Sequence, residues 1–94
     1  MSEPMPQQPD RQSIERRVRE LMIDKLRVSA GLLERSDSAT PLLGSGIGLD
    51  SMEAMSLAVE IEEAFGIVVL DEDLNEQLFS SFASLTDYII KQGG

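Results

Sequence analysis

Apolar residues recur at steps of three and four in three stretches of the chain, which is the spacing of amphipathic helices. The stretches begin near residue 13, at Ser51 and near residue 81, and the second ends at Gly66. Glycine suits the left-handed conformation that commonly ends a helix. The apolar positions of the first and third stretches are Ile14, Val18, Leu21, Met22 and Leu26, and Phe82, Leu85, Tyr88 and Ile89. The pattern therefore predicts three long helices.

The segment between the first two predicted helices, residues 29–49, contains Pro41, four glycines and several serines, so no long regular element fits it. It is nevertheless too apolar for a free linker, because it carries Leu32, Leu33, Leu42, Leu43, Ile47 and Leu49. We expect this long loop to lie across the core and to plug its end. Gly44, Gly46 and Gly48, just before the second helix, are interpreted as slack in the loop.

The remaining segments contain no alternating strand pattern. Residues 67–69 are β-branched and predict an extended segment that leads into a short acidic helical turn. The expected fold class is all-α, a small bundle of three main helices plus one short helix, with a long loop between the first two long helices. Residues 1–12 are expected to be a disordered leader because they hold three prolines and little to bury, and residues 13–92 form one domain.

Composition removes several classes of chemistry. The chain has no cysteine and no histidine, which excludes disulfides, Ser-His-Asp triads and zinc sites built on these residues. No apolar run approaches the roughly 20 residues that span a bilayer, and the N-terminus lacks a signal-peptide pattern. We therefore expect a cytoplasmic monomer with no membrane insertion.

Charge is distributed unevenly along the chain. Residues 36–94 contain eleven acidic residues and a single basic one, Lys91, whereas residues 1–35 contain seven basic and six acidic residues. So acidic a surface repels nucleic acid and attracts proteins with basic surfaces.

The second predicted helix has two apolar faces. Ala54, Leu57, Ala58, Ile61 and Phe65 share an arc of about 100°, the width of a core-facing stripe. A separate outer strip consists of Met52, Met55 and Val59, and four glutamates flank it: Glu53, Glu60, Glu62 and Glu63. The outer strip is either additional core in a bundle that surrounds this helix or an exposed docking surface. Burial of unpaired glutamates would cost several kcal/mol each, which favours the docking surface.

The start of this helix holds the candidate reactive residue, Ser51. Asp50 is a good N-cap, and Glu53 stands three positions later, where its side chain can reach back to complete a capping box. Ser51 would then occupy the first helical position with a free hydroxyl, at a helix end that tolerates an attached phosphate. Alternatively Ser51 is itself the cap. Serine hydrolysis has no support, because no histidine can serve as its base.

A second motif is incomplete. Asp71, Asp73 and Asn75 match the first three ligand positions of an EF-hand loop, but Glu76 replaces the required glycine and Phe82 replaces the bidentate glutamate. No metal site is predicted, and a small Ca²⁺ sensor is kept only as a further alternative.

The stretch GLDSMEAMSLAVEIEEAFGI, Gly48 to Ile67, resembles the signature around the modified serine of acyl carrier proteins, and the resemblance extends from Ile14 to Ile90. It implies that a phosphopantetheinyl transferase attaches 4'-phosphopantetheine from coenzyme A to Ser51, with Asp50 as a flanking recognition residue. The thiol of this arm would carry an acyl group as a thioester, and the protein itself would not be an enzyme.

The resemblance also implies which residues contact partners. Met52, Met55 and Val59 match apolar contacts of the transferase and of acyl-loading and acyl-processing enzymes, and Glu53, Glu62 and Glu63 match acidic contacts. Leu57, Ile61 and Phe65 match residues that line an acyl pocket. Met52 stands where leucine is commonest and Ser56 where many fatty-acid carriers have glutamate, which favours a specialised lipid, polyketide or related pathway. The alternative function is a non-covalent acidic adaptor that docks basic partners through the same outer strip.

Overall fold

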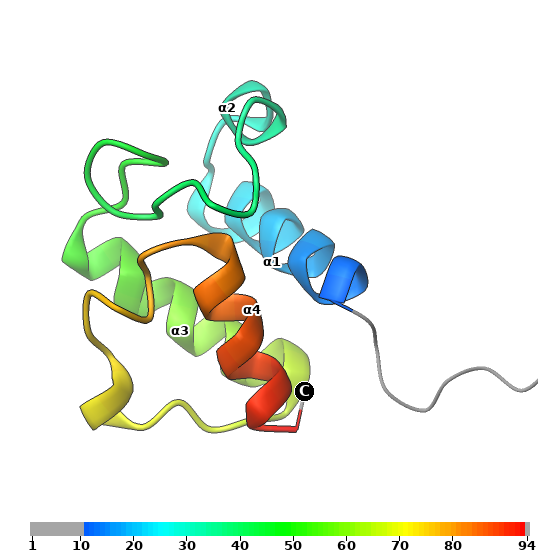
Figure 1. Ribbon diagram of the computed structural model, residues 1–94, viewed down its shortest axis with the longest axis vertical. Helices are drawn as coiled ribbons and strands as arrows, with labels where there is room; N and C mark the ends of the chain where they lie inside the picture. The colour runs from blue at the N-terminus through cyan, green and yellow to red at the C-terminus, as the bar shows by residue number, and fades with distance from the viewer. Residues whose placement is uncertain (1–10, 94) are drawn as a thin grey trace, which may run out of the picture.

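The computed structural model describes residues 11–93, and these residues form a helical bundle (Figure 1). Its elements are α1 (Arg11–Leu26), α2 (Ala30–Glu34), α3 (Ser51–Phe65), the 3₁₀ turn η1 (Asp71–Asp73) and α4 (Phe82–Lys91). Within residues 11–93 the only pairing of the β type is an isolated bridge between Leu43 and Leu49. The predicted all-α fold with three long helices and a long loop is confirmed.

Two details of the structure differ from the predicted organisation. Residues 1–10 of the expected leader lie outside the described residues, and α1 begins at Arg11, two residues before the predicted start. The long loop also contains α2, a five-residue helix that the sequence pattern did not predict. The Ser29 hydroxyl caps α2 by accepting a hydrogen bond from the backbone N–H of Leu32.

The core lies between α1 and the two other long helices, because α1 packs against both α3 and α4. Each long helix contributes one buried stripe: Ile14, Val18, Leu21 and Met22; Ala54, Leu57, Ala58 and Ile61; and Phe82, Leu85 and Ile89. These are the stripes that the sequence spacing predicts, except that Leu26, Phe65 and Tyr88 are only partly buried against the core. In the part of the chain that the structure describes, no helix is both long enough and apolar enough to cross a membrane.

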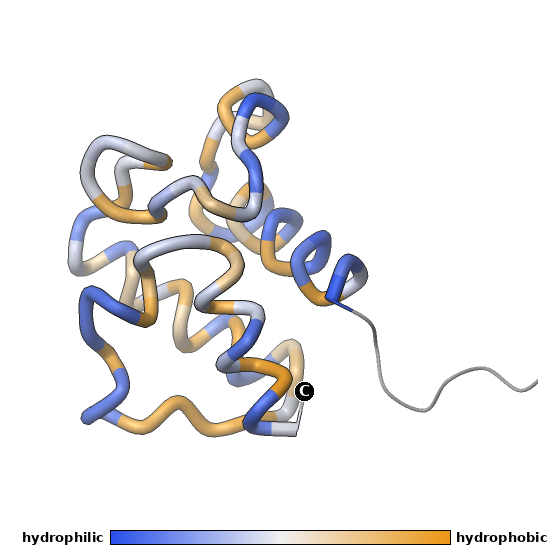
Figure 2. The backbone as a smooth tube through the Cα atoms, viewed as in Figure 1, coloured by the Kyte–Doolittle hydropathy of each residue, from blue (hydrophilic) through white to orange (hydrophobic). Residues whose placement is uncertain are grey.

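The segments that join the helices supply the rest of the core. Leu33, Leu42, Ile47 and Leu49 of the long loop are buried, which confirms that this loop plugs one end of the bundle. After α3 the chain is extended, with Ile67 and Val69 buried. Figure 2 shows this apolar stretch running into the hydrophilic η1.

The loop before α3 is tightly folded, and the interpretation of its glycines as slack is wrong. A Cβ on Gly46 would lie 1.9 Å from the carbonyl oxygen of Pro41, closer than any real contact. The same carbonyl accepts a 2.9 Å hydrogen bond from the backbone N–H of Ile47. Gly44 and Gly48 have φ angles of 64° and 91°, which residues with side chains rarely adopt. The glycines therefore permit a specific compact turn that ends at Asp50.

Candidate functional site

Ser51 is the first residue of α3 and is exposed to solvent. Its hydroxyl makes no hydrogen bond with any residue among 11–93. The Ser51 hydroxyl therefore lies at the N-terminal end of α3 and takes no part in the hydrogen bonds that hold the fold.

The reason lies in the two acidic neighbours of Ser51. A carboxylate oxygen of Asp50 accepts a 2.8 Å hydrogen bond from the backbone N–H of Glu53, and Oε1 of Glu53 accepts a 3.1 Å bond from the backbone N–H of Asp50. This is the capping box expected from the sequence, and the alternative in which Ser51 is the cap is wrong. The helix dipole at this end favours a negatively charged substituent on Ser51.

A cavity of about 580 Å³ lies beside Ser51. Its walls are mainly apolar and come from three parts of the chain: the loop before α3, the first turns of α3, and residues 71–79. The lining residues are Leu43, Leu49, Ser51, Ala54, Met55, Asp71, Leu74, Asn75, Glu76 and Phe79. The volume falls within the range of about 300–1,000 Å³ that is usual for small-molecule sites.

The residues that the resemblance suggested for an acyl pocket lie in the core or against it. Leu57 and Ile61 are fully buried in the core and Phe65 is half-buried against it. None of the three lines the cavity beside Ser51. The sequence signal for the observed lining was the apolar character of Leu43 and Leu49 within a long loop. Nothing local indicated that residues 71–79 would form the facing wall.

The outer strip of α3 faces solvent. Met52, Met55 and Val59 are 77%, 58% and 49% exposed, so the alternative in which they form additional core is wrong. Two of the flanking glutamates also serve the fold: Glu53 completes the capping box, and a carboxylate oxygen of Glu62 accepts a 2.8 Å hydrogen bond from the backbone N–H of Val69. Glu63 is exposed.

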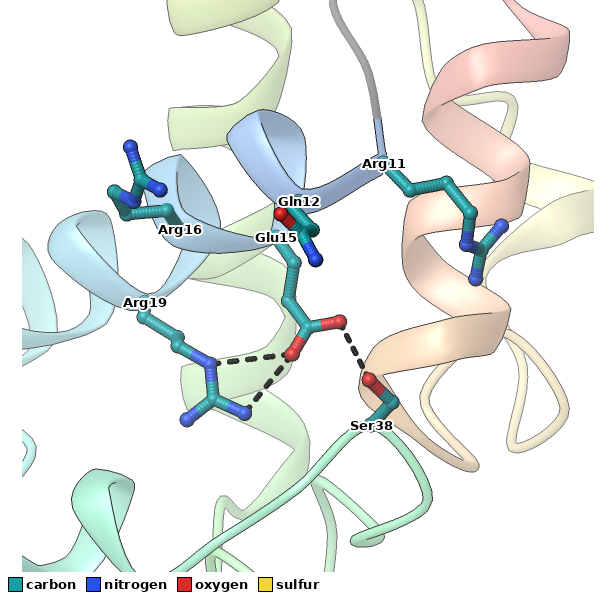
Figure 3. Close-up of a pocket in the computed structure, with 6 residues that line it drawn as sticks. All are labelled: Arg11, Gln12, Glu15, Arg16, Arg19 and Ser38. Atoms are coloured by element: carbon teal, nitrogen blue, oxygen red, sulfur yellow. Dashed lines mark hydrogen bonds and ion pairs between the residues drawn. The ribbon is translucent and has the colours of Figure 1, made fainter.

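Another cavity, of about 880 Å³, lies along α1 and shares no lining residue with the cavity beside Ser51; it is lined by Arg11, Gln12, Glu15, Arg16, Arg19 and Ser38 (Figure 3). The carboxylate of Glu15 points into its centre, where it pairs with Arg19 and accepts a hydrogen bond from Ser38. Arg11 pairs with Asp87 of α4. Because Glu15 carries a negative charge at the centre, this cavity is a poorer site for an anionic ligand than its arginines suggest.

The acidic residues near η1 do not form a metal site. Among residues 11–93, no group of three or more histidine, cysteine, aspartate or glutamate side chains is placed to hold a metal ion. The Asp73 carboxylate instead accepts a 2.7 Å hydrogen bond from the Tyr88 hydroxyl.

Comparison with known proteins identifies a family. Residues 16–89 match the family described as phosphopantetheine attachment site, a span that begins in α1 and ends in α4, with Ser51 and all of α3 inside it. No curated protein matches the chain. The prosthetic group of that family is 4'-phosphopantetheine, and a serine hydroxyl that is exposed, unbonded and next to an apolar cavity fits its attachment.

Proposed function

Since the chain belongs to the phosphopantetheine attachment site family, we propose that it is an acyl carrier protein that holds its 4'-phosphopantetheine on Ser51. The observation that carries the assignment of the residue is the unbonded hydroxyl at the first position of α3, freed by the Asp50 cap and open to the cavity. Several other serines are exposed, but Ser51 combines a helix N-terminus with this cavity.

The attachment step makes limited demands on this chain. The Ser51 oxygen attacks the phosphorus of coenzyme A that bears pantetheine, the P–O bond of the pyrophosphate breaks, and adenosine 3',5'-bisphosphate leaves. The hydroxyl proton passes to a base on the transferase, because Asp50 and Glu53, close to Ser51 in the sequence, already hold the capping box and no carboxylate among residues 11–93 is hydrogen-bonded to the hydroxyl. The N-terminal dipole of α3 then stabilises the phosphodiester charge. The bound group supplies a thiol that forms a thioester with an acyl group, and the carrier performs no catalysis itself.

The cavity beside Ser51 is proposed to shelter part of the acyl group. Leu43, Leu49, Leu74 and Phe79 offer it an apolar environment, with Ala54 and Met55 on the α3 side. Burial of each methylene contributes about 0.8 kcal/mol, which favours insertion of the chain over exposure to water.

The outer strip is proposed to dock the transferase and the acyl-loading and acyl-processing enzymes. Three exposed apolar side chains on the helix that begins with Ser51 give these enzymes a surface next to the reactive group. The methionines tolerate different partner shapes, and the acidic surroundings favour basic partner surfaces. Met52 and Ser56, both exposed, favour a specialised lipid, polyketide or related pathway.

Incubation of the unmodified protein with coenzyme A, Mg²⁺ and a permissive phosphopantetheinyl transferase, followed by intact mass measurement, tests the assignment. The wild-type protein and Ser56→Ala, a matched change at an exposed serine of the same helix, are expected to gain one phosphopantetheine, and Ser51→Ala none. An unmodified wild-type protein that still binds basic partners would support the non-covalent adaptor instead. Modification of Ser51→Ala would show that another residue carries the group.

A further inference from the structure

One wall of the cavity beside Ser51 contains little regular structure. This wall segment, residues 71–79, contains a single 3₁₀ turn, η1, and contributes Asp71, Leu74, Asn75, Glu76 and Phe79 to the lining. Leu78 and Phe79, at its far end, are buried, whereas residues 75–77 are exposed. The other two walls are the fifteen-residue helix α3 and the loop with Leu43 and Leu49, which the tight turn at Gly46 and the bridge between the two leucines hold in place. A change in cavity size is therefore expected to come from the wall segment.

Space is also present behind the wall segment. A further pocket of about 530 Å³, open to solvent and called the α4 pocket below, is lined by Asp73, Asn75, Gln77 and Leu78 of the wall segment and by Ser84, Asp87, Tyr88 and Lys91 of α4. Asn75 lines both this cavity and the one beside Ser51. A close-packed element cannot shift without disturbing its neighbours, but this segment has room on both of its faces.

Hydrogen bonds from two other elements hold the wall segment in place. The hydroxyl of Tyr88 on α4 donates to the Asp73 carboxylate at 2.7 Å and accepts from the backbone N–H of Leu70 at 3.3 Å. At the far end the carbonyl of Phe79 accepts a 3.1 Å bond from the backbone N–H of Leu42. Glu62 of α3 also holds the chain just before the near end, by accepting the 2.8 Å bond from Val69. The Tyr88 hydroxyl is the contact that ties the near end to α4.

We propose that the hydrogen bond between Tyr88 and Asp73 is a latch that sets the position of the wall segment and thereby the size of the acyl group that the carrier shelters. With the latch closed, the cavity beside Ser51 keeps its present volume. A larger acyl group moves the segment toward α4, into the α4 pocket, and breaks the bond between Tyr88 and Asp73. Sheltering a larger group therefore carries an added free-energy cost. Tyr88 is thus a specificity-determining residue that does not contact Ser51. This inference rests on the proposed function.

The first test needs no acyl group. Tyr88→Phe removes only the hydroxyl, and Asp73→Ala removes its acceptor. In Tyr88→Phe the amide of Leu70, which loses its acceptor, is expected to exchange its hydrogen about tenfold faster, while amides of α1 and α3 keep their rates. Glu72→Ala is the matched control, because the Glu72 side chain is exposed in the same turn and makes no hydrogen bond within residues 11–93. Equal exchange in Tyr88→Phe and wild type would overturn the latch.

The second test uses the loaded protein. Wild type and variants are loaded with saturated acyl chains of increasing length, and cleavage of the thioester by hydroxylamine is timed. In both latch variants, the acyl chain whose thioester is cleaved most slowly is expected to be longer than in wild type. The double variant is expected to behave like either single variant, because both changes remove the same hydrogen bond. If the dependence of the cleavage rate on chain length is unchanged in the latch variants, or shifts equally in Glu72→Ala, the latch is wrong while the carrier function stands. If no variant and no wild-type protein accepts phosphopantetheine, the proposed function fails and the inference falls with it.

Discussion

The guanidinium of Arg19 lies 4.2 Å from the centre of the Phe82 ring and connects α1 to the first residue of α4. The same group donates hydrogen bonds to the carbonyl of Leu33 at 2.7 Å and to the hydroxyl of Ser36 at 2.8 Å. It also pairs with Glu15. One side chain thus connects α1, α2, α4 and the loop that follows α2.

Replacement of Arg19 by lysine is expected to lower the free energy of unfolding by about 1–2 kcal/mol, although the charge is kept. An ammonium has no plane to stack on Phe82 and cannot supply the same fork of donors. The Leu33 carbonyl would lose its charged donor and keep only the two donors of Ser36, the backbone N–H and the hydroxyl. Urea denaturation measures the loss. Arg16→Lys is the control, since Arg16 is exposed and makes no ion pair among the described residues, and it should change stability by less than about 0.5 kcal/mol. Equal effects of the two changes would contradict this role.

Removal of one buried hydroxyl is expected to raise stability, in contrast to the replacement of Arg19. Thr86 is 1% exposed, and its Oγ1 has no hydrogen-bond partner among residues 11–93. Thr86→Val removes the unsatisfied group and keeps the shape, so stability is expected to rise by about 1 kcal/mol. Thr40→Val should instead lower stability by about 0.5–1 kcal/mol, because Oγ1 of Thr40 accepts a 2.9 Å bond from the backbone N–H of Asp37. A loss of stability in Thr86→Val would show that the hydroxyl has a partner after all.

Two helices end in the left-handed conformation with different residues. Gly66 follows α3 with φ of 67°, and Arg27 follows α1 with φ of 61°. Since a side chain is strained in this conformation, Arg27→Gly is expected to stabilise the protein by about 0.5–1 kcal/mol and Gly66→Ala to destabilise it by about 1 kcal/mol. Thermal unfolding of both variants checks the signs. Changes of the same sign would show that a side chain is not strained at one of the two positions.

The sequence predicted most features that depend on neighbours within one helix. The capping box of Asp50 and Glu53 and the buried and exposed faces of α3 all follow from spacing along the chain. Features that join distant segments were not predictable in this way. The contact of Tyr88 with Asp73 joins residues 15 positions apart, and the facing walls of the cavity depend on how a loop and a 3₁₀ turn fold around α3. The tight approach of Gly46 to Pro41 likewise depends on the path of the loop.

The protein has one tyrosine and no tryptophan, so the near-ultraviolet absorbance of phenolate reports Tyr88 alone. Burial, and then the hydrogen bond to Asp73, raises the pKa of Tyr88 above its ordinary value of 10.0. Above about pH 10 the folded protein therefore keeps a proton that the unfolded chain has lost. This contribution to stability is complete below pH 10 and is lost as the pH rises through the folded pKa.

Wild type is accordingly expected to lose more free energy of unfolding above pH 10 than Tyr88→Phe, which keeps every other titrating group. The phenolate midpoint should lie higher in the native protein than in urea, and Asp73→Ala should lower the native midpoint. A native midpoint at or below the value in urea would contradict the raised pKa.

The loop before α3 provides the last prediction, through a pair of Gly→Ala changes. In Gly46→Ala the new Cβ meets the carbonyl of Pro41, and since this is backbone, the loop must open to accept it. Stability is expected to fall by at least about 2 kcal/mol, and transfer of phosphopantetheine to Ser51 should slow, because the displaced turn leads into the Asp50 cap. In Gly31→Ala the nearest atoms are side-chain atoms 3.7 Å away, and the position lies within α2, so stability should rise by up to about 1 kcal/mol. Urea denaturation and timed intact mass measure the two effects. If Gly46→Ala proved as stable as Gly31→Ala, the turn would be a flexible tether and would not hold Ser51 in position.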